Sequence, residues 1–404
     1  MTIPKKIIRV AFIGLFVVFV LFSSIVAFVT DWWWFSEVGY TQIFIKSLIA
    51  KIVLFSAAGI FAAVFLFTNF SLAIRSTHST GSGWTAILPA ALIGQPVSVS
   101  SRIVKKLAAM LSVIIALFFG LVAAADWQGV LKFISGAAFG ATDPIFNKDI
   151  GFYIFSLPVL QAGLGFAKTL IILTLIGCAI IYFLRGSLHF PNLKSLKQLR
   201  TGSSESFEGT ESPEYPKGTQ ALQYSRGIER GARIHLGILL AIFLATIAVG
   251  VYLSRFTLLT SQDGLVFGAT YTDATVRIFM LWLSMVAAVL AVIAAILWAW
   301  RGKLSPLIGA VVLYVVVGFT GTLIPSLVQK LIVAPNELVK ETPFIKYNIA
   351  ATRQAFALDK IEEREISGDK PITAADISAN NLTVKNVRLW DRKPLLSTFS
   401  QIQE

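Results

Sequence analysis

The chain has 404 residues, of which 55% are hydrophobic and only 14% are charged, and its formal net charge is +13. Globular chains usually carry about 25% charged residues, so this composition excludes an ordinary soluble protein and predicts a polytopic membrane protein. A single cysteine, Cys178, excludes an intrachain disulfide, and three histidines in total argue against a histidine-built metal site.

Seven apolar runs are long enough to cross a bilayer as helices. The first has a long apolar region and a poor cleavage site after it, which favours a retained signal-anchor over a cleaved leader. The predicted spans lie near residues 7–29, 47–74, 103–125, 164–185, 235–255, 277–300 and 304–328. The predicted fold class is an all-α polytopic membrane protein with a seven-span domain over residues 1–330.

The basic residues are distributed unevenly between the connections. The N-terminus and the connections after the second, fourth and sixth spans carry net charges of +3, +4, +3 and +2, whereas the opposite connections each sum to 0 and the tail to +1. Lys and Arg concentrate on cytoplasmic loops. The pattern predicts a protein of the cell membrane with a cytoplasmic N-terminus and an extracytoplasmic tail. The net positive charge is then a topology signal and does not indicate nucleic-acid binding.

An aromatic run, "DWWWF", follows the first span, and a further tryptophan, Trp127, follows the third. Tryptophan rings are amphipathic and settle at the headgroup level of a bilayer. We interpret Trp32, Trp33, Trp34, Phe35 and Trp127 as membrane-interface anchors. The alternative is an aromatic patch that grips a lipid or a partner.

The outer connections contain the polar side chains that could form a site. In residues 126–163 an apolar stripe predicts a helix lying in the interface, and the following polar residues suggest either turn chemistry around Asp143-Pro144 or, with lower weight, a metal site. Asp273 precedes the sixth span and could cap it. The stripe is formed by Trp127, Leu131, Ile134 and Ala138, and the candidate outer polar cluster by Asp143, Asp149, Asp263 and Asp273.

The deep interiors of the spans contain no ionisable residue, which argues against a proton or ion relay. Lys51, Lys168 and Arg255 lie near outer ends and His235 near an inner end, where long side chains reach toward the headgroups. No sequence pattern assigns a catalytic, cofactor-binding or metal-binding residue.

Residues 331–404 begin an extracytoplasmic segment with mixed patterns. "PNELVKETPFIKYNIAATRQAFAL" has a helical apolar face that Pro343 could open at the first turn. "LTVKNVRLW" alternates weakly and predicts a strand, and "PLLSTFSQIQE" predicts a further helix. We expect the segment to be the incomplete start of an α/β-type domain.

Several stretches resemble one family along the whole chain and in the right order. They are "DWWWFSEVGYTQIFIKSLIAKIVLF", "FGATDPIFNKDIGFYIFSLPVL", "RFTLLTSQDGLVFGATYTD" and the tail stretches "APNELVKETPFIKYNIAATRQAFALDKI" and "NVRLWDRKPLLSTFSQIQE". They resemble the large bacterial membrane family catalogued as uncharacterised protein family 0182. The resemblance implies a seven-span half followed by a long extracytoplasmic half, in a protein about twice this length, and it carries over no functional residue.

Three functions remain open at this point. The sequence favours a non-enzymatic membrane base that holds an extracytoplasmic domain, because its polar chemistry is sparse and external. The alternatives are a transporter or channel for a lipid or envelope precursor, and an enzyme acting at the outer interface through the aspartates. The expected partners are the lipid bilayer and envelope proteins, with no cofactor and no nucleic acid, and the oligomeric state is open.

Overall fold

The structure is a computed structural model that describes residues 5–75, 84–86, 97–99, 101–184, 228–262, 264, 267–365, 368, 371–387 and 391–402. The chain divides into two compact units, Met1–Asn348 and Ile349–Glu404. Each unit is described by itself.

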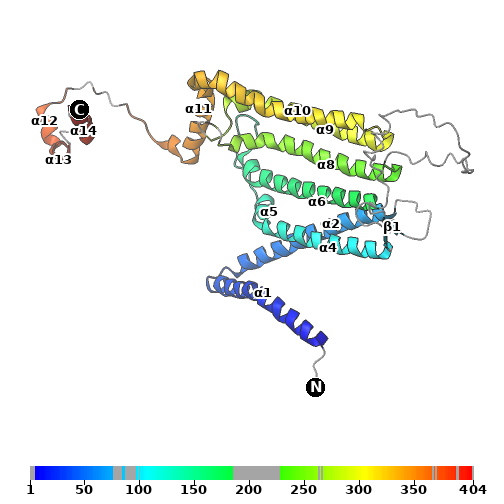
Figure 1. Ribbon diagram of the computed structural model, residues 1–404. Helices are drawn as coiled ribbons and strands as arrows, with labels where there is room; N and C mark the ends of the chain where they lie inside the picture. Colours follow the sequence, from blue (N-terminus) through cyan, green and yellow to red (C-terminus); the bar gives the residue numbers. More distant parts are fainter. Residues whose placement is uncertain are drawn as a thin grey trace, which may run out of the picture. The chain divides into compact units, whose positions relative to one another are not determined.

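Long helices form the first unit, and each packs on the next in a row (Figure 1). The row runs α4, α2, α6, α8, α9, α10. The first helix, α1, contacts α2. The bounds are α1 Lys5–Glu37, α2 Thr41–Arg75, α4 Ser101–Ala125, α6 Leu157–Leu184, α8 Arg230–Thr257, α9 Ile278–Arg301 and α10 Ser305–Val328.

Six helices among the described residues are long and apolar enough to cross a membrane. They coincide with α2, α4, α6, α8, α9 and α10, and so with the predicted spans from the second to the seventh. The predicted span at 7–29 falls within α1, of which the side chains of residues 5–13, 15, 17, 18, 20 and 21 lie outside the description.

Small residues let neighbouring helices approach closely, as is usual for helices packed in lipid. A Cβ built on Gly237 of α8 would lie 2.5 Å from the Cβ of Ala299 on α9, and one built on Gly120 of α4 would lie 2.8 Å from the carbonyl oxygen of Phe55 on α2. The buried face of α9 is mostly alanine. These contacts fix the spacing of the row because no larger side chain fits there.

Short elements connect the long helices. A two-stranded antiparallel sheet pairs β1 Trp84–Ala86 with β2 Val97–Val99. The link from α9 to α10 turns at Gly302, which has a left-handed φ of 76° and donates its N–H to the carbonyl of Trp298 at 2.9 Å. The remaining connecting elements are α5 Trp127–Ile134, η1 Phe152–Ser156, η2 Leu258–Thr260, η3 Asp273–Arg277, η4 Gln329–Val333 and η5 Ala334–Asn336.

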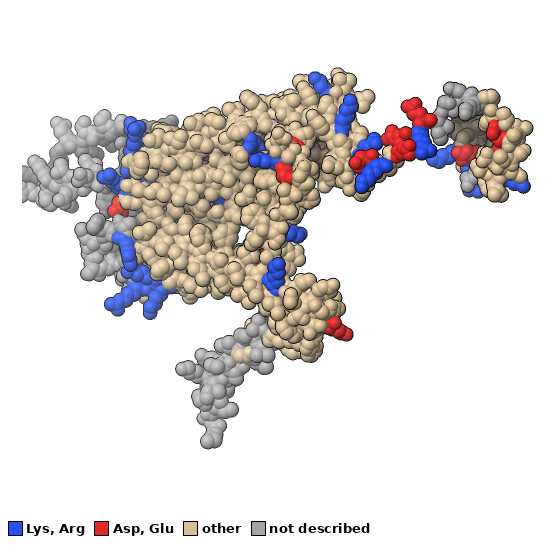
Figure 2. Space-filling view, turned by 180° about the vertical axis from the view of Figure 1, so that it is seen from behind, with Lys and Arg blue, Asp and Glu red and all other residues tan. Residues whose placement is uncertain are grey.

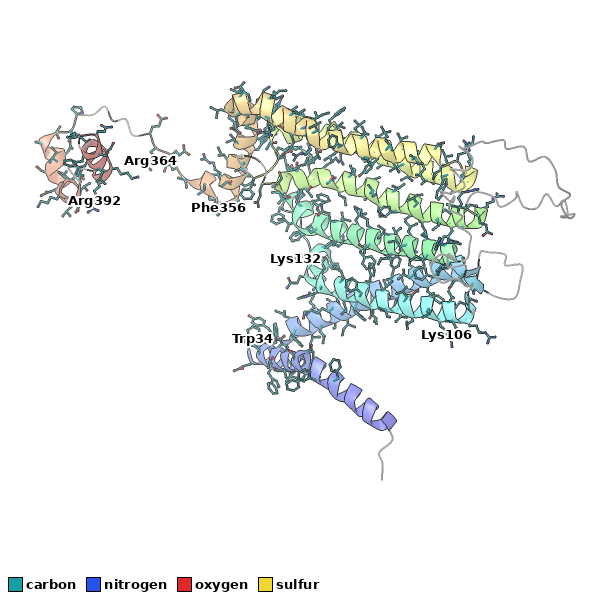
Figure 3. The ribbon with its side chains drawn as sticks, viewed as in Figure 1. Trp34, Lys106, Lys132, Phe356, Arg364 and Arg392 are labelled. Carbon is teal, nitrogen blue, oxygen red and sulfur yellow. The ribbon has the colours of Figure 1, made fainter. Side chains whose placement is uncertain are left out.

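The helix ends form two opposite sides of the row, and these two sides differ in charge (Figure 2). At the end where α2 and α9 finish, the basic end, Lys106 lies on α4 (Figure 3) together with other cations. At the end where α2 and α9 begin, the mixed-charge end, acidic and basic side chains occur together. The described cations of the basic end are Arg75, Arg102, Lys105, Lys106, Arg230, Arg233, Arg301 and Lys303.

Two details of the tail prediction are wrong. The predicted helix starts earlier than expected, as α11 Glu337–Ala355, so Pro343 lies inside it instead of in its first turn. Residues 382–386 of the predicted strand belong to α13 Asn381–Asn386. A lone strand would leave its backbone groups unpaired, whereas here the N–H of Val384 bonds to the carbonyl of Asn380 at 3.0 Å.

Three further helical elements lie among the described residues of the second unit, and residues 361–365 and 371–373 are not helical. A capping box at Thr373 and Asp376 starts α12 Ala374–Ala379. The predicted terminal helix is present as α14 Arg392–Ile402, and η6 Leu358–Lys360 follows α11. The structure therefore supports a largely helical fold, and the α/β character expected of this segment is not seen in its described residues.

Candidate functional site

The mixed-charge end of the row contains most of the residues singled out in the sequence. Asp143 and Asp149 belong to the loop between α5 and η1, Asp273 lies at the start of the helix leading into α9, and Trp127 begins α5. Asp263 lies outside the described residues. No hydrogen bond or ion pair between described residues joins Asp273 to Asp143 or Asp149.

The Asp143 carboxylate organises its own loop. Its oxygens accept the N–H groups of Ile145 at 2.9 Å and Lys148 at 2.7 Å, and the hydroxyl of Tyr153 at 2.8 Å. A further bond comes from the N–H of Phe146. The turn chemistry expected around Asp143-Pro144 is therefore present.

The same contacts set the acidity of Asp143. Burial acts to raise its pKa, but the hydrogen bonds from Phe146, Lys148, Tyr153 and Ile145 favour the charged form and together lower the pKa below its usual value. The carboxylate is thus held ionised by the loop that it shapes.

Asp149 closes the other side of this loop. It accepts the N–H groups of Phe139 at 3.1 Å, Gly140 at 2.9 Å and Gly151 at 2.7 Å. The bond from Phe139, followed by that from Gly151, lowers the pKa of the Asp149 carboxyl. Both aspartates of the loop are therefore bound to backbone N–H groups. In the described part of the chain, no three His, Cys, Asp or Glu side chains form a group that could hold a metal ion.

The helix leading into α9 begins with a second arrangement of carboxylates. Asp273 accepts the N–H of Thr270 at 3.0 Å while its own N–H bonds to the Thr270 hydroxyl at 3.2 Å, which is a reciprocal capping box. Asp273 is 2% exposed and also pairs with Arg277 at 2.9 Å. It contributes to the expected cap as the third helical residue, with Thr270 in the capping position.

A residue that the sequence did not single out completes this helix start. Glu341 of α11 is 4% exposed, and its two oxygens accept the N–H of Tyr271 at 3.0 and 3.3 Å. Lys340 lies over the Tyr271 ring at 4.9 Å, and the Asn348 amide donates to the carbonyl of Phe267 at 2.9 Å. These contacts hold α11 against the start of the α9 helix.

Arg255 departs from the expected reach toward headgroups. Its guanidinium lies 4.1 Å from the ring centroids of both Tyr252 and Trp282 and 5.3 Å from that of Phe256, and its Nε donates to the Tyr252 carbonyl at 3.1 Å. The side chain is buried at the end of α8. Cation–π contact with three rings stabilises the charge there.

His235 bridges three helices near the basic end. Its Nε2 lies 3.0 Å from the Asn69 side-chain oxygen on α2, and its Nδ1 lies 2.9 Å from the Tyr182 hydroxyl on α6. The Asn69 amide nitrogen donates to the carbonyl of Phe65, so its oxygen is an acceptor. A neutral imidazole with the proton on Nε2 satisfies both contacts.

The aromatic run after the first span separates into two pairs of side chains. Trp32 and Phe35 contact Phe44 of α2, with ring centroids 5.7 and 5.5 Å apart. Trp33 and Trp34 are 67% and 59% exposed, and Figure 3 shows Trp34 in the aromatic group at the end of α1. Two rings therefore join α1 to α2, and the other two are free to anchor in an interface.

The family model described as "Uncharacterised protein family (UPF0182)" matches residues 8–404. UPF0182 proteins of Trichlorobacter lovleyi and Geobacter sulfurreducens are each 34% identical over 395 residues, which is 97% of this chain and 40% of the relative. One of Trichodesmium erythraeum is 31% identical over 406 residues, with 100% and 40% covered. The chain thus spans about 40% of the length of these curated relatives. No solved structure matches.

Proposed function

We propose that this chain, which belongs to the UPF0182 family, is a membrane base that holds an extracytoplasmic region at one face of the cell membrane. The proposal includes α1 as a seventh span, with the N-terminus in the cytoplasm. The six long apolar helices support the membrane class, and the carboxylate contacts at the mixed-charge end supply the argument for the role.

The observation that carries the proposal is the attachment of α11. Glu341 binds the first helical N–H group of the α9 helix. Burial raises the pKa of Glu341, and the hydrogen bond from Tyr271 opposes that effect by favouring the charged form. The polar side chains of this end therefore secure the segment that follows the last span to the row of helices. Such an attachment suits a base for what comes after α10.

The distribution of charge supports the orientation. Cations predominate among the described residues of the basic end, whereas acidic and basic residues occur together at the other end. Because Lys and Arg concentrate on the cytoplasmic side, the basic end is the cytoplasmic end in this proposal. The loop carboxylates and α11 then lie outside.

Cysteine labelling tests the proposal. In a Cys178→Ala background, a cysteine at Leu382 should react with an impermeant thiol reagent in intact cells, and one at Lys106 should react only after the membrane is opened. Leu382 is 81% exposed, so its own burial does not prevent reaction. Labelling of position 106 but not of position 382 in intact cells would reverse the orientation and remove the role.

A further inference from the structure

An apolar groove of about 430 Å³ lies between α2 and α5 at the mixed-charge end. One wall is a face of α2 and the other is the apolar face of the short helix α5, which begins at Trp127. The groove is lined by Gln42, Ile45, Lys46, Ile49, Ala50, Val53 and Leu54 of α2 and by Trp127, Val130, Leu131 and Ile134 of α5.

Polarity changes along the groove in one direction. Gln42 and Lys46 lie nearest the start of α2, and every lining residue of α2 beyond Lys46 is apolar down to Leu54. At 1.5 Å per residue, Gln42 to Leu54 covers about 18 Å of the helix axis. Half of a bilayer's hydrocarbon core is about 15 Å thick. The groove therefore has the length and the polarity gradient of a single leaflet.

The first helix does not fill this groove. It contacts α2 through Phe44, which is 8% exposed. At 3.6 residues per turn, Lys46, Ile49 and Val53 lie on the side of α2 opposite Phe44. These three residues are exposed in the structure.

The charges at the groove favour an anionic occupant. Lys46 is the charged residue among those that line it, whereas Lys51 is outside the lining and its ammonium lies 5.3 Å from the Trp127 ring centroid. No acidic residue lines the groove. A lysine near a membrane surface attracts acidic headgroups by about 1 kcal/mol.

We propose that the groove binds an acidic phospholipid of the leaflet at the mixed-charge end. One acyl chain would lie along Ile49 and Val53 toward Leu54, and the phosphate would meet Lys46 with Gln42 as a neutral donor. The groove runs about 18 Å along α2, which is comparable to the half-thickness of the hydrocarbon core, so it accommodates one acyl chain. The inference goes beyond the base role and requires only that the six apolar helices cross a bilayer.

The test uses the full chain, purified in an uncharged detergent and freed of lipid. Phosphatidylglycerol and phosphatidylcholine with the same acyl chains are titrated, and bound lipid is counted by native mass spectrometry. We expect phosphatidylglycerol to bind about fivefold more tightly, as one lysine contact predicts. Lys46→Ala should abolish this preference and leave the phosphatidylcholine affinity unchanged, and Lys46→Arg should retain the preference.

The matched control is Lys132→Ala, because Lys132 is an exposed cation on α5 (Figure 3) that does not line the groove. It should keep the preference.

Val53→Trp, or Ile49→Trp if the first variant does not fold, fills the groove and should weaken the binding of both lipids. Equal affinities in the unaltered chain, or a preference that survives Lys46→Ala, would overturn the proposal. So would a dimer that Val53→Trp dissociates, because a second copy would then occupy the groove. Cysteine labelling is independent of these readouts, so the base role can fail without the lipid site failing.

Discussion

Glu341 and Asp273, on different helices, accept the N–H groups of two consecutive residues. Glu341 takes that of Tyr271 at 3.0 Å, and Asp273 takes that of Thr270 at 3.0 Å. The first turn of a helix has N–H groups without intrahelical partners and carries the positive end of the helix dipole. The buried carboxyl groups of Asp273 and Glu341 supply acceptors for these N–H groups at the positive end of the dipole. Glu341 belongs to α11, so this contact also attaches α11 to the start of the helix.

Replacing Glu341 with alanine should loosen α11 from this helix start. The N–H of Tyr271 would lose its acceptor in a partly buried position, at a cost of roughly 1–2 kcal/mol in the free energy of unfolding. Thermal unfolding in detergent measures the loss. A spin label at Lys346, an exposed position of α11, should also gain mobility. Glu341→Gln keeps an acceptor and should cost less. Glu337→Ala, one turn earlier on α11, is the control. An equal loss for Glu337→Ala would contradict the role assigned to Glu341.

Gly237→Ala should destabilise the contact between α8 and α9. The added methyl group meets the Cβ of Ala299 at 2.5 Å, and overpacking of this kind costs about 1–3 kcal/mol. Thermal denaturation in detergent reports the loss. Gly318→Ala in α10 is the matched control, because nothing lies within 4 Å of a Cβ built there. That variant should be neutral or slightly stabilising. Similar melting temperatures for the two variants would show that the close approach does not limit the packing.

The loop formed by residues 139–153 should lose stability in acid. The pKa of Asp143 is lowered in the folded protein, so its carboxylate stabilises the fold fully above the unfolded pKa of about 3.9. This contribution is lost as the pH falls from there through the lower folded pKa. Melting temperatures between pH 7 and pH 2.5 measure the effect. The acid limb is the fall in melting temperature toward pH 2.5. Asp143→Asn should make this fall smaller, whereas Asp31→Asn, at an exposed position, should not. An unchanged acid limb in Asp143→Asn would count against the prediction.

Substitutions in the aromatic run should separate into two effects. Trp32→Leu removes an edge contact with Phe44 and should weaken the packing of α1 on α2 by about 1 kcal/mol. Trp33→Leu with Trp34→Leu should leave that packing intact and change only the depth of α1 in the bilayer, because these rings are exposed. Disulfide crosslinking between introduced cysteines on α1 and α2 reports the first effect, and quenching by depth-graded lipid probes reports the second. Loss of crosslinking in the double variant would reverse the assignment.

The long helices were predictable because each apolar run is a local signal. α8 covers residues 230–257 where a span was expected near 235–255, and α9 covers 278–301 where one was expected near 277–300. The helix at Trp127 was also predicted, although it ends at Ile134 instead of continuing to Ala138. A run of apolar side chains can be recognised in the sequence without knowing which helices pack beside it.

The contacts between distant residues were not predictable in this way. Glu341 lies in a polar stretch of the tail, and only the fold brings it to Tyr271, 70 residues earlier. Tyr182 and His235 are 53 residues apart, and Asn69 and His235 are 166 residues apart. The weak alternation was misleading at residues 382–386, where a short helix satisfies its own backbone groups. Residues 388–390 of the predicted strand lie outside the described residues.

The left-handed turn at Gly302 has a consequence for how the protein is made. Only residues 302–304 separate the end of α9 from the start of α10, and the Arg233 side chain lies so close to Gly302 that a Cβ built there would be 2.7 Å from its Nη1. A connection this short keeps the adjoining ends of α9 and α10 close together during synthesis. We expect the two helices to insert into a membrane together, as one hairpin. A charge introduced into either helix should then impair insertion of both.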